Sequence, residues 1–262
     1  MIDTVALTCV TKRLAACMDA HRRPNGFLQS TYDAPPFGTA YVCISPSEQS
    51  TDPAANHNRI ELWGAEGGLT ADGLASLLAL FDQADVAQFF VWLGPGPDMD
   101  AVRQWLRAAG MCRVARQPLM LRHDAAARPP AVPSLDVRIL AVETCAEAAI
   151  LIDLAAHDDG RAIGTAALCA RAGVAYLGAT SSTEIDDRHR VQQALLAKQI
   201  ETATTLGCHT IVAEAPASLE GTSDHLCDDG FALAYVREIY GRRASSSRAT
   251  ATRGRSAAPA AA

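Results

Sequence analysis

Apolar side chains recur at the 3.6-residue period of an α-helix in three stretches, 71–81, 99–109 and 190–206. The stripes consist of Leu74, Leu77, Leu78 and Phe81 in the first, Met99, Val102, Leu106 and Ala109 in the second, and Leu196, Ile200 and Ala203 in the third. The end signals are Thr70 and Asp98, which cap the starts of the first two, and Gly110 and Gly207, which stop the last two. These patterns predict three helices. Two more are expected, one over 143–156 and a short one from about Ser223 to Gly230.

Strands are predicted where apolar and β-branched residues alternate or run together between turn residues. The predicted strands are 38–44, 59–63, 86–93 and 111–122 in the first part of the chain, and 137–142, 163–170, 174–180, 210–215 and 231–240 in the second. The turn Arg171-Ala172-Gly173 predicts a hairpin between two of them. Pro118 has no N–H to donate, so it predicts a bulge or an edge position for the strand 111–122.

A proline-rich break, HDAAARPPAVPSLD at 123–136, separates two patterned regions. Its three prolines disfavour both helix and central strand, so it is predicted to be a linker. The expected domains are a first half, 1–122, and a second half, 137–243. The remaining residues, 244–262, combine Arg with Ala, Ser, Thr and Pro and are expected to be a disordered tail.

The two halves end in the same way, with a helix, a strand, a short helix, a Gly and a final strand. Leu106, Gly110, Met111 and Leu119 recur as Leu226, Gly230, Phe231 and Ile239, in each case 120 positions later. The sequence Leu-Leu-Ala at 77–79 also recurs at 195–197. Shared order and spacing predict a tandem duplication, with the first half as the more degenerate copy.

Composition limits the classes of function. Hydrophobic residues make up 49% and charged residues 20% of the chain, the balance of a soluble globular protein. The net charge of −6 argues against a nucleic-acid partner, because phosphate contacts need clustered Lys and Arg. No apolar run approaches the roughly 20 residues of a membrane helix, so no membrane partner is expected. The eight cysteines form no C-x-x-C pair and predict reduced, mostly buried thiols in a cytoplasmic protein.

Candidate chemistry lies between the strands predicted at 174–180 and 210–215. A polar loop there leads into a helix, whose N-terminus presents free N–H groups and the positive end of a dipole. Arg188, His189 and Arg190 add positive charge at this point, and an anionic ligand would explain it. The alternative is that these are solvated residues at a helix terminus, and charge alone does not choose between the two.

The residues of the second half resemble a known family. VAYLGATSSTEIDDRHRVQQALLAKQIETATTLGCHTIVAEAP, followed by LCDDGFALAYVREIY, is similar to the core of the GNAT superfamily of acetyl-CoA-dependent N-acetyltransferases. The run 191–196, the pair Gly207-Cys208 and the pair Gly230-Phe231 match that family in place. The resemblance covers 174–240 closely and 136–240 loosely.

The resemblance implies acetyl-CoA as co-substrate, an unidentified amine as acceptor and no metal. The pantetheine arm would lie between the strands at 174–180 and 210–215, the strand amides would polarise the thioester carbonyl, and the pyrophosphate would rest on the following helix. The implied cofactor-binding residues are Gly178, Ala179 and Thr180 on the strand and Arg188, Arg190, Val191 and Gln192 on the helix.

The chain also departs from the family pattern. Asp187, Arg188 and Arg190 stand where the family has an Arg and two glycines, which let backbone amides approach the phosphates. No Tyr occupies the usual position of the general acid, in the short helix before Gly230. Candidate catalytic groups are therefore Glu214 as base and Tyr235 as acid, with Glu184 and Tyr176 as further candidates.

We expect an α/β (α+β) fold of two tandem GNAT-like units, a mixed, mostly antiparallel sheet flanked by helices. The units would pack as a pseudo-dimer within one chain, or the chain would form a homodimer. The expected activity is transfer of an acyl group from acetyl-CoA to an amine. The alternative is a catalytically inactive GNAT-like protein with a structural or regulatory role, and an unrelated doubly wound nucleotide-binding fold is a third possibility.

Overall fold

A computed structural model of the chain describes Leu14, Cys17 and the ranges 28–33, 35–46, 50–51, 56–62, 68–96, 98–123, 135–145, 148–178, 180–184, 187–215 and 222–242. The strands are β1 Leu28–Asp33, β2 Thr39–Ile44, β3 Arg59–Leu62, β4 Phe90–Leu93, β5 Met111–His123, β6 Asp136–Thr144, β7 Ile150–Asp158, β8 Arg161–Arg171, β9 Val174–Leu177, β10 Ser181–Ser182, β11 Thr210–Glu214 and β12 Ala232–Arg242. The helices are α2 Ala71–Gln83, α3 Met99–Ala108, α4 Arg188–Thr205 and α5 Thr222–Asp228.

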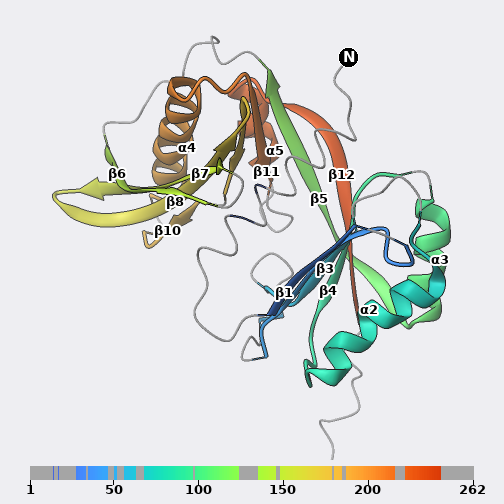
Figure 1. Ribbon diagram of the computed structural model, residues 1–262. Helices are drawn as coiled ribbons and strands as arrows, with labels where there is room; N and C mark the ends of the chain where they lie inside the picture. The colour runs from blue at the N-terminus through green and yellow to red at the C-terminus, as the bar shows by residue number, and fades with distance from the viewer. Residues whose placement is uncertain are drawn as a thin grey trace, which may run out of the picture.

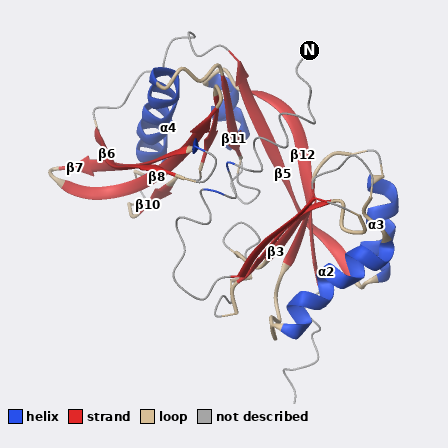
Figure 2. Ribbon diagram, in the orientation of Figure 1, coloured by secondary structure: helices blue, strands red, loops and turns tan. Residues whose placement is uncertain are grey.

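The strands form one 12-stranded sheet that runs through both halves of the chain. Its order is β1-β2-β3-β4-β12-β5-β11-β9-β8-β7-β6, with β10 paired to β8. Pairing is antiparallel except between β3 and β4 and between β9 and β11. Helices α2 and α3 lie against the strands of the first half, and α4 and α5 against those of the second (Figures 1 and 2).

The last strand of each half is exchanged with the other half. β12, which ends the second half, lies between β4 and β5, and β5, which ends the first half, lies between β12 and β11. The predicted boundary at 122/137 therefore separates the elements along the chain, but the sheet joins them. Neither half has a complete sheet without the strand that the other contributes.

The register of β5 with β12 reveals a pseudo-two-fold axis. Gln117 pairs with Arg237, its counterpart 120 positions later, so the axis passes through this pair. Each strand has one extra residue, Val114 in β5 and Ala234 in β12, and these bulges are also 120 positions apart. The duplication predicted from sequence spacing thus appears as a near-symmetric pairing of the two exchanged strands.

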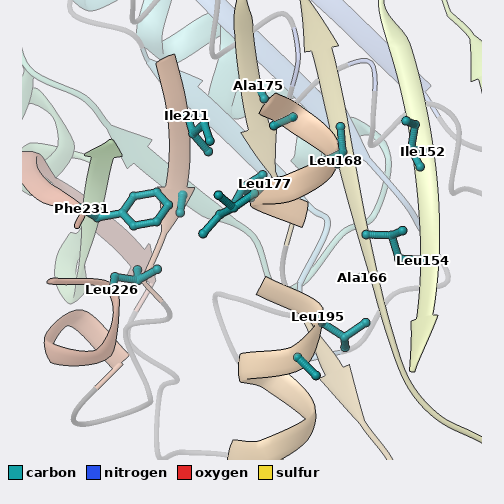
Figure 3. Packing of buried hydrophobic residues seen from close by; sticks show 14 of the residues in the cluster. Ile152, Leu154, Ala166, Leu168, Ala175, Leu177, Leu195, Ile211, Leu226 and Phe231 are labelled. Carbon is teal, nitrogen blue, oxygen red and sulfur yellow. The ribbon is translucent and has the colours of Figure 1, made fainter. Parts of the chain in front are cut away.

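Each half has an apolar core between its helices and the sheet. In the second half, Leu195 of α4 lies with Leu168, Ile211 and Phe231 from the strands and the start of β12 (Figure 3). The first-half core is built on Leu74, Leu77 and Phe81 of α2. The exchanged strands enter both cores, because Met120 of β5 packs in the second-half core and Tyr240 of β12 in the first.

Most of the predicted elements are confirmed, including the cap on α2. Thr70 Oγ1 accepts a hydrogen bond from Gly73 N–H at 3.0 Å. Ala172 and Gly173 both have positive φ, 49° and 78°, which is the geometry of the predicted hairpin turn. β4 is shorter than expected, since residues 86–89 precede it without strand structure.

One prediction is wrong, that of a helix over 143–156. Ile150–Asp158 forms β7, an interior strand hydrogen-bonded to β6 and β8. The Ala-rich sequence favours a helix locally, but the two neighbouring strands satisfy its backbone, and apolar clusters cover both of its faces. For the strand that contains Pro118, the bulge is confirmed, at Val114, whereas the edge position is not, because β5 is an interior strand. Pro118 O accepts from Ala215 N–H, so the side of Pro118 that lacks an N–H faces β11, at the place where the pairing of β11 with β5 ends at Glu214.

Candidate functional site

The sheet of the second half opens between β9 and β11. These parallel strands pair from Val174–Thr210 to Leu177–Ala213, and among the described residues they pair no further. Beyond that point each strand follows its other neighbour. Gly178 N–H donates to Ala167 O of β8 at 2.8 Å, and Ala215 N–H donates to Pro118 O of β5 at 3.1 Å. A wedge therefore begins at Gly178 and Glu214.

A β-bulge lies at the mouth of this wedge. Leu177 is opposite Leu168, whereas Ser181 is opposite Thr165. The four steps from Leu177 to Ser181 therefore match only three steps along β8. One extra residue is accommodated between Leu177 and Ser181, which leaves a backbone amide outside the ladder. The predicted cofactor-binding residues Gly178 and Thr180 lie in this stretch; Ala179 lies outside the described residues.

Gln199 of α4 supports the open edge from beneath. Its side chain is buried, at 1% exposure, and its Nε2 donates to Ala167 O at 2.7 Å and to Gly178 O at 3.3 Å. A carbonyl that is shielded from water and has no donor is costly, so Gln199 satisfies the half-buried carbonyl of Gly178 at the place where regular strand pairing ends.

The start of α4 has the features expected of an anion-binding helix terminus. Asp187, the residue before the helix, makes no side-chain capping bond, and the first turn holds no acid. Arg188 is exposed and has no hydrogen bond or ion pair with a described residue. Arg190 forms an exposed ion pair with Asp187 at 3.2 Å. The ring of His189 contacts that of His225 on α5, with centroids 4.3 Å apart, so the two helices meet at this point.

The other two predicted residues of α4 have different roles. Val191 is fully buried against Gly164, where an added Cβ would overlap its side chain. Its N–H donates to Asp187 O at 3.0 Å, so Val191 fixes the helix on the sheet. The amides without an intrahelical partner are those of 188–190. Gln192 is half-buried beside them.

The same region of the first half is closed. Trp92 corresponds to Glu214, because their partners Ile239 and Leu119 are 120 positions apart. Yet β3 and β4 stay paired through Glu61–Trp92 and Leu62–Leu93, and Gly94 N–H then donates to Leu62 O at 2.8 Å. These are the positions at which β9 and β11 have separated. The first half has no wedge.

The two catalytic candidates lie in a buried charged cluster near the pseudo-two-fold axis. Arg237, 2% exposed, forms ion pairs with Glu214 and, at 3.7 Å, with Glu61. Gln117 Nε2 donates to the other oxygen of Glu214 at 3.1 Å. Burial lowers the pKa of Arg237, but the two carboxylates outweigh that effect and hold its pKa above its usual range. Both oxygens of Glu214 are thus engaged by other side chains.

The remaining acid and base candidates surround this cluster or lie apart from it. Tyr235 and Tyr176 are both near Arg237, and the hydroxyl oxygen of Tyr235 is buried. Glu184 is half-buried in the loop before α4 and lies 3.8 Å from Arg161. The structure therefore brings Glu214, Tyr235 and Tyr176 together and leaves Glu184 on the helix side.

Sequence reasoning missed Gln199, Gln117 and Arg237. Gln199 interrupts the apolar stripe of a helix, which is a signal for a buried polar contact. Gln117 and Arg237 occupy the same place in the two copies, and a polar residue at the same point of both strand patterns is a signal for a buried polar network. Neither signal identifies a partner without the tertiary structure.

Seven of the eight cysteines lie among the described residues, where all seven are free thiols and three are buried; Cys9 lies outside. Burial raises the pKa of Cys145 to about 12 and that of Cys169 to about 11. The described side chains include no His, Cys, Asp and Glu cluster that could hold a metal. None of the described helices has both the length and the apolar character to cross a bilayer.

Solved structures of other proteins have a similar fold. A GCN5-related N-acetyltransferase from Kribbella flavida aligns over 94% of this chain and 97% of its own, with a TM-score of 0.60 and 14% identity. The chain has the GNAT fold. A tandem GNAT protein from the clavulanic acid biosynthesis pathway aligns over 91% and 94%, with a TM-score of 0.54 and 13% identity.

A conserved protein of unknown function from Staphylococcus epidermidis also aligns, over 87% of this chain and 98% of its own, with a TM-score of 0.53 and 7% identity. No family model matches the sequence, and no curated protein matches it. Because the structural alignments span nearly the whole of both chains, the GNAT fold includes both halves, from β1 to β12.

Proposed function

We propose that the second half binds an acyl-CoA, with acetyl-CoA as the donor, and transfers its acyl group to an amine. One observation carries the proposal: the sheet is open at Gly178 and Glu214, beside a helix start whose amides have no intrahelical partner and whose Arg188 is paired with no described residue. Both features suit a long ligand with an extended amide-bearing arm and a pyrophosphate.

The arm of the donor would lie in the wedge and pair with the free edges of β9 and β11. Because Gly178 N–H is already used by Ala167 O, the amide among the described residues that would polarise the thioester carbonyl is that of Thr180. The pyrophosphate would rest on the amides of 188–190, with the guanidinium of Arg188 beside it in place of the missing glycine loop.

In the reaction, the nitrogen of the amine attacks the thioester carbonyl, its proton leaves, and the thiolate departs with a proton. Glu214 is the proposed base, because it lies where the wedge opens, and Tyr235 is the proposed acid. The engagement of Glu214 by Arg237 and Gln117 favours a second candidate, in which the chain binds acyl-CoA without transferring the acyl group.

Calorimetry with acetyl-CoA and with CoA tests the binding part of the proposal. We expect heat with both ligands and at least a tenfold loss of affinity in Arg188→Glu, since about 1.5–3 kcal/mol is typical for a hydrogen bond to a charged group. Lys198→Glu is the matched control, with the same charge reversal on the same helix away from its start. No heat at millimolar ligand, or equal loss in the control, contradicts the proposal.

Transfer is tested separately, by mass spectrometry of an amine panel that includes polyamines, aminoglycosides and lysine peptides, incubated with acetyl-CoA. An acetylated product that disappears in Glu214→Gln, with acetyl-CoA affinity unchanged, supports the base role. Binding without any product supports the second candidate.

We place the protein in the cytoplasm, since the seven described cysteines are free thiols.

A further inference from the structure

A second site lies in the first half, between α3 and the exchanged strands. The last turns of α3, the start of β5 and the end of β12 enclose a cavity of about 500 Å³. Its charged and polar lining consists of Arg103, Arg107, Arg113, Glu238 and Tyr240. Figure 1 shows α3 at the opposite end of the molecule from α4, so this cavity is separate from the wedge.

One carboxylate holds part of this lining together. Glu238 accepts hydrogen bonds from Arg103 Nε at 2.9 Å, from Arg113 Nη1 at 3.1 Å and from the hydroxyl of Tyr240 at 3.1 Å. Burial raises the pKa of Glu238, but these donors outweigh that effect and keep its pKa below its usual range. Glu238 is therefore ionised and fixes two guanidinium groups in the wall of the cavity.

The cavity holds more positive charge than Glu238 can balance. Arg107 is exposed and forms no hydrogen bond or ion pair with a described residue. Arg113 donates only through Nη1 to the described residues, and its side chain is 52% exposed. Three guanidinium groups thus meet one carboxylate, in a protein whose net charge is −6. Among the described residues one other acid is in contact, Asp100, which pairs with Arg103 and is itself 92% exposed.

The duplication supplies a comparison for these residues. The corresponding positions in the second half, 120 residues away, hold Ser223 for Arg103, Cys227 for Arg107, Leu233 for Arg113, Pro118 for Glu238 and Met120 for Tyr240. The second half builds the same helix and strands without a single charge at these places. Packing of the helix on the sheet therefore does not require the arginines.

We propose that this cavity binds a small molecule carrying several oxyanion groups, either carboxylates or phosphates. Guanidinium groups form planar, paired hydrogen bonds with both kinds of oxyanion. Arg107 and Arg113 provide the free donors, and Glu238 positions Arg113 and Arg103. The volume is that of a compact metabolite, and the lining also includes the apolar residue Met111, which can contact its carbon skeleton.

The proposal is tested by calorimetry of the full chain with citrate and with pyrophosphate, at low salt and at about 0.5 M salt. We expect binding of at least one of the two, at least tenfold weaker in Arg107→Glu and in Arg113→Glu and weaker at high salt. Citrate alone identifies carboxylates, and pyrophosphate alone identifies phosphates. Arg107 is exposed and has no partner among the described residues, so Arg107→Glu is expected to unfold at the same temperature as the parent, whereas Arg113→Glu loses its ion pair with Glu238 and is expected to unfold at a slightly lower temperature.

Two controls separate this site from the wedge. Arg188→Glu alters the start of α4 and should leave the binding of citrate unchanged, and Arg107→Glu should leave the binding of acetyl-CoA unchanged. The proposal is overturned if neither anion binds at 10 mM, if binding survives both Arg107→Glu and Arg113→Glu, or if it is lost only in Arg188→Glu.

Discussion

The two halves of this protein share a fold but differ where a ligand would enter. In the first half, β3 and β4 stay paired through Leu62–Leu93, and a further bond from Gly94 closes the end. In the second half, the equivalent strands part after Leu177–Ala213. The difference is between the β3–β4 pair and the β9–β11 pair. On the other side, β4 pairs with β12 in the same register as β11 pairs with β5. At this place the described strands are open in the second half and closed in the first.

The helix between the two parallel strands, α2 in the first half and α4 in the second, also differs in how its N-terminus is capped. α2 begins at Thr70, whose hydroxyl satisfies the amide of Gly73, and has Asp72 in its first turn. α4 begins with no such cap and with Arg188 and Arg190 in that turn. The first arrangement satisfies a helix terminus from within the chain. The second leaves amides and positive charge for an external anion.

The comparison assigns separate tasks to the halves. The second half is equipped for a CoA-like ligand, whereas the first is closed there and has its arginine-lined cavity under α3 instead. The exchanged strands link these tasks in one sheet. Four sets of substitutions test this comparison.

The largest effect is expected at the pseudo-two-fold axis, where the residues of the central pair differ. Arg237→Met leaves Glu214 buried without its cation and removes one of two arginines from Glu61, which keeps its ion pair with Arg59 at 2.6 Å; it should lower the free energy of unfolding by about 3–5 kcal/mol. Gln117→Leu, at the matching position, should cost only about 1 kcal/mol. Urea unfolding measures both. Equal costs would show that the axis carries no special charge pairing.

The second effect concerns the open edge. Gln199→Leu removes the donor for Gly178 O and should cost about 1–3 kcal/mol of unfolding free energy, because a buried carbonyl loses its partner. Gln193→Leu on the same helix is the control and should change the stability by less than about 0.5 kcal/mol. Urea unfolding at neutral pH checks both. A cost below that of the control would contradict the support role of Gln199.

The third effect compares the two helix starts. Thr70→Ala removes a capping hydrogen bond and should cost about 1 kcal/mol. Asp187→Ala removes no capping bond and should cost less than about 0.5 kcal/mol. Because it also releases Arg190 from its ion pair, it should strengthen acetyl-CoA binding. Thermal unfolding and calorimetry measure the pair, and weaker binding in Asp187→Ala would argue against a phosphate at this terminus.

The smallest effect is pH-dependent. The pKa of Glu238 in the folded protein lies below its ordinary value of 4.5, so its stabilising contribution is present at neutral pH and is lost as the pH falls through the folded-state pKa. Glu238→Gln should therefore cost about 0.5–1 kcal/mol at pH 7, and this cost should shrink toward zero as the pH falls through the folded-state pKa of Glu238. Unfolding curves at neutral pH and along a series of acidic pH values check the sign. A cost that grows in acid would contradict it.

Local physics explains what the sequence predicted correctly. Apolar stripes, Thr70 and the glycines after the helices predict α2, α3 and α4, because helix periodicity and caps act within a few residues. The positive-φ turn at Ala172-Gly173 predicts its hairpin for the same reason. The 120-residue spacing predicts the duplication, and the cationic helix start predicts the candidate anion site.

Tertiary structure alone decided the rest, because strand pairing joins residues that are far apart in the chain. β7 is a strand although its sequence favours a helix, since β6 and β8 complete its hydrogen bonds. The exchange of β5 and β12 leaves no signal in the local sequence, because either strand could make the backbone hydrogen bonds that the edge strand of each half needs. The opening at Gly178 and the burial of Arg237 follow from those non-local pairings, and with them the choice of which half can hold a ligand.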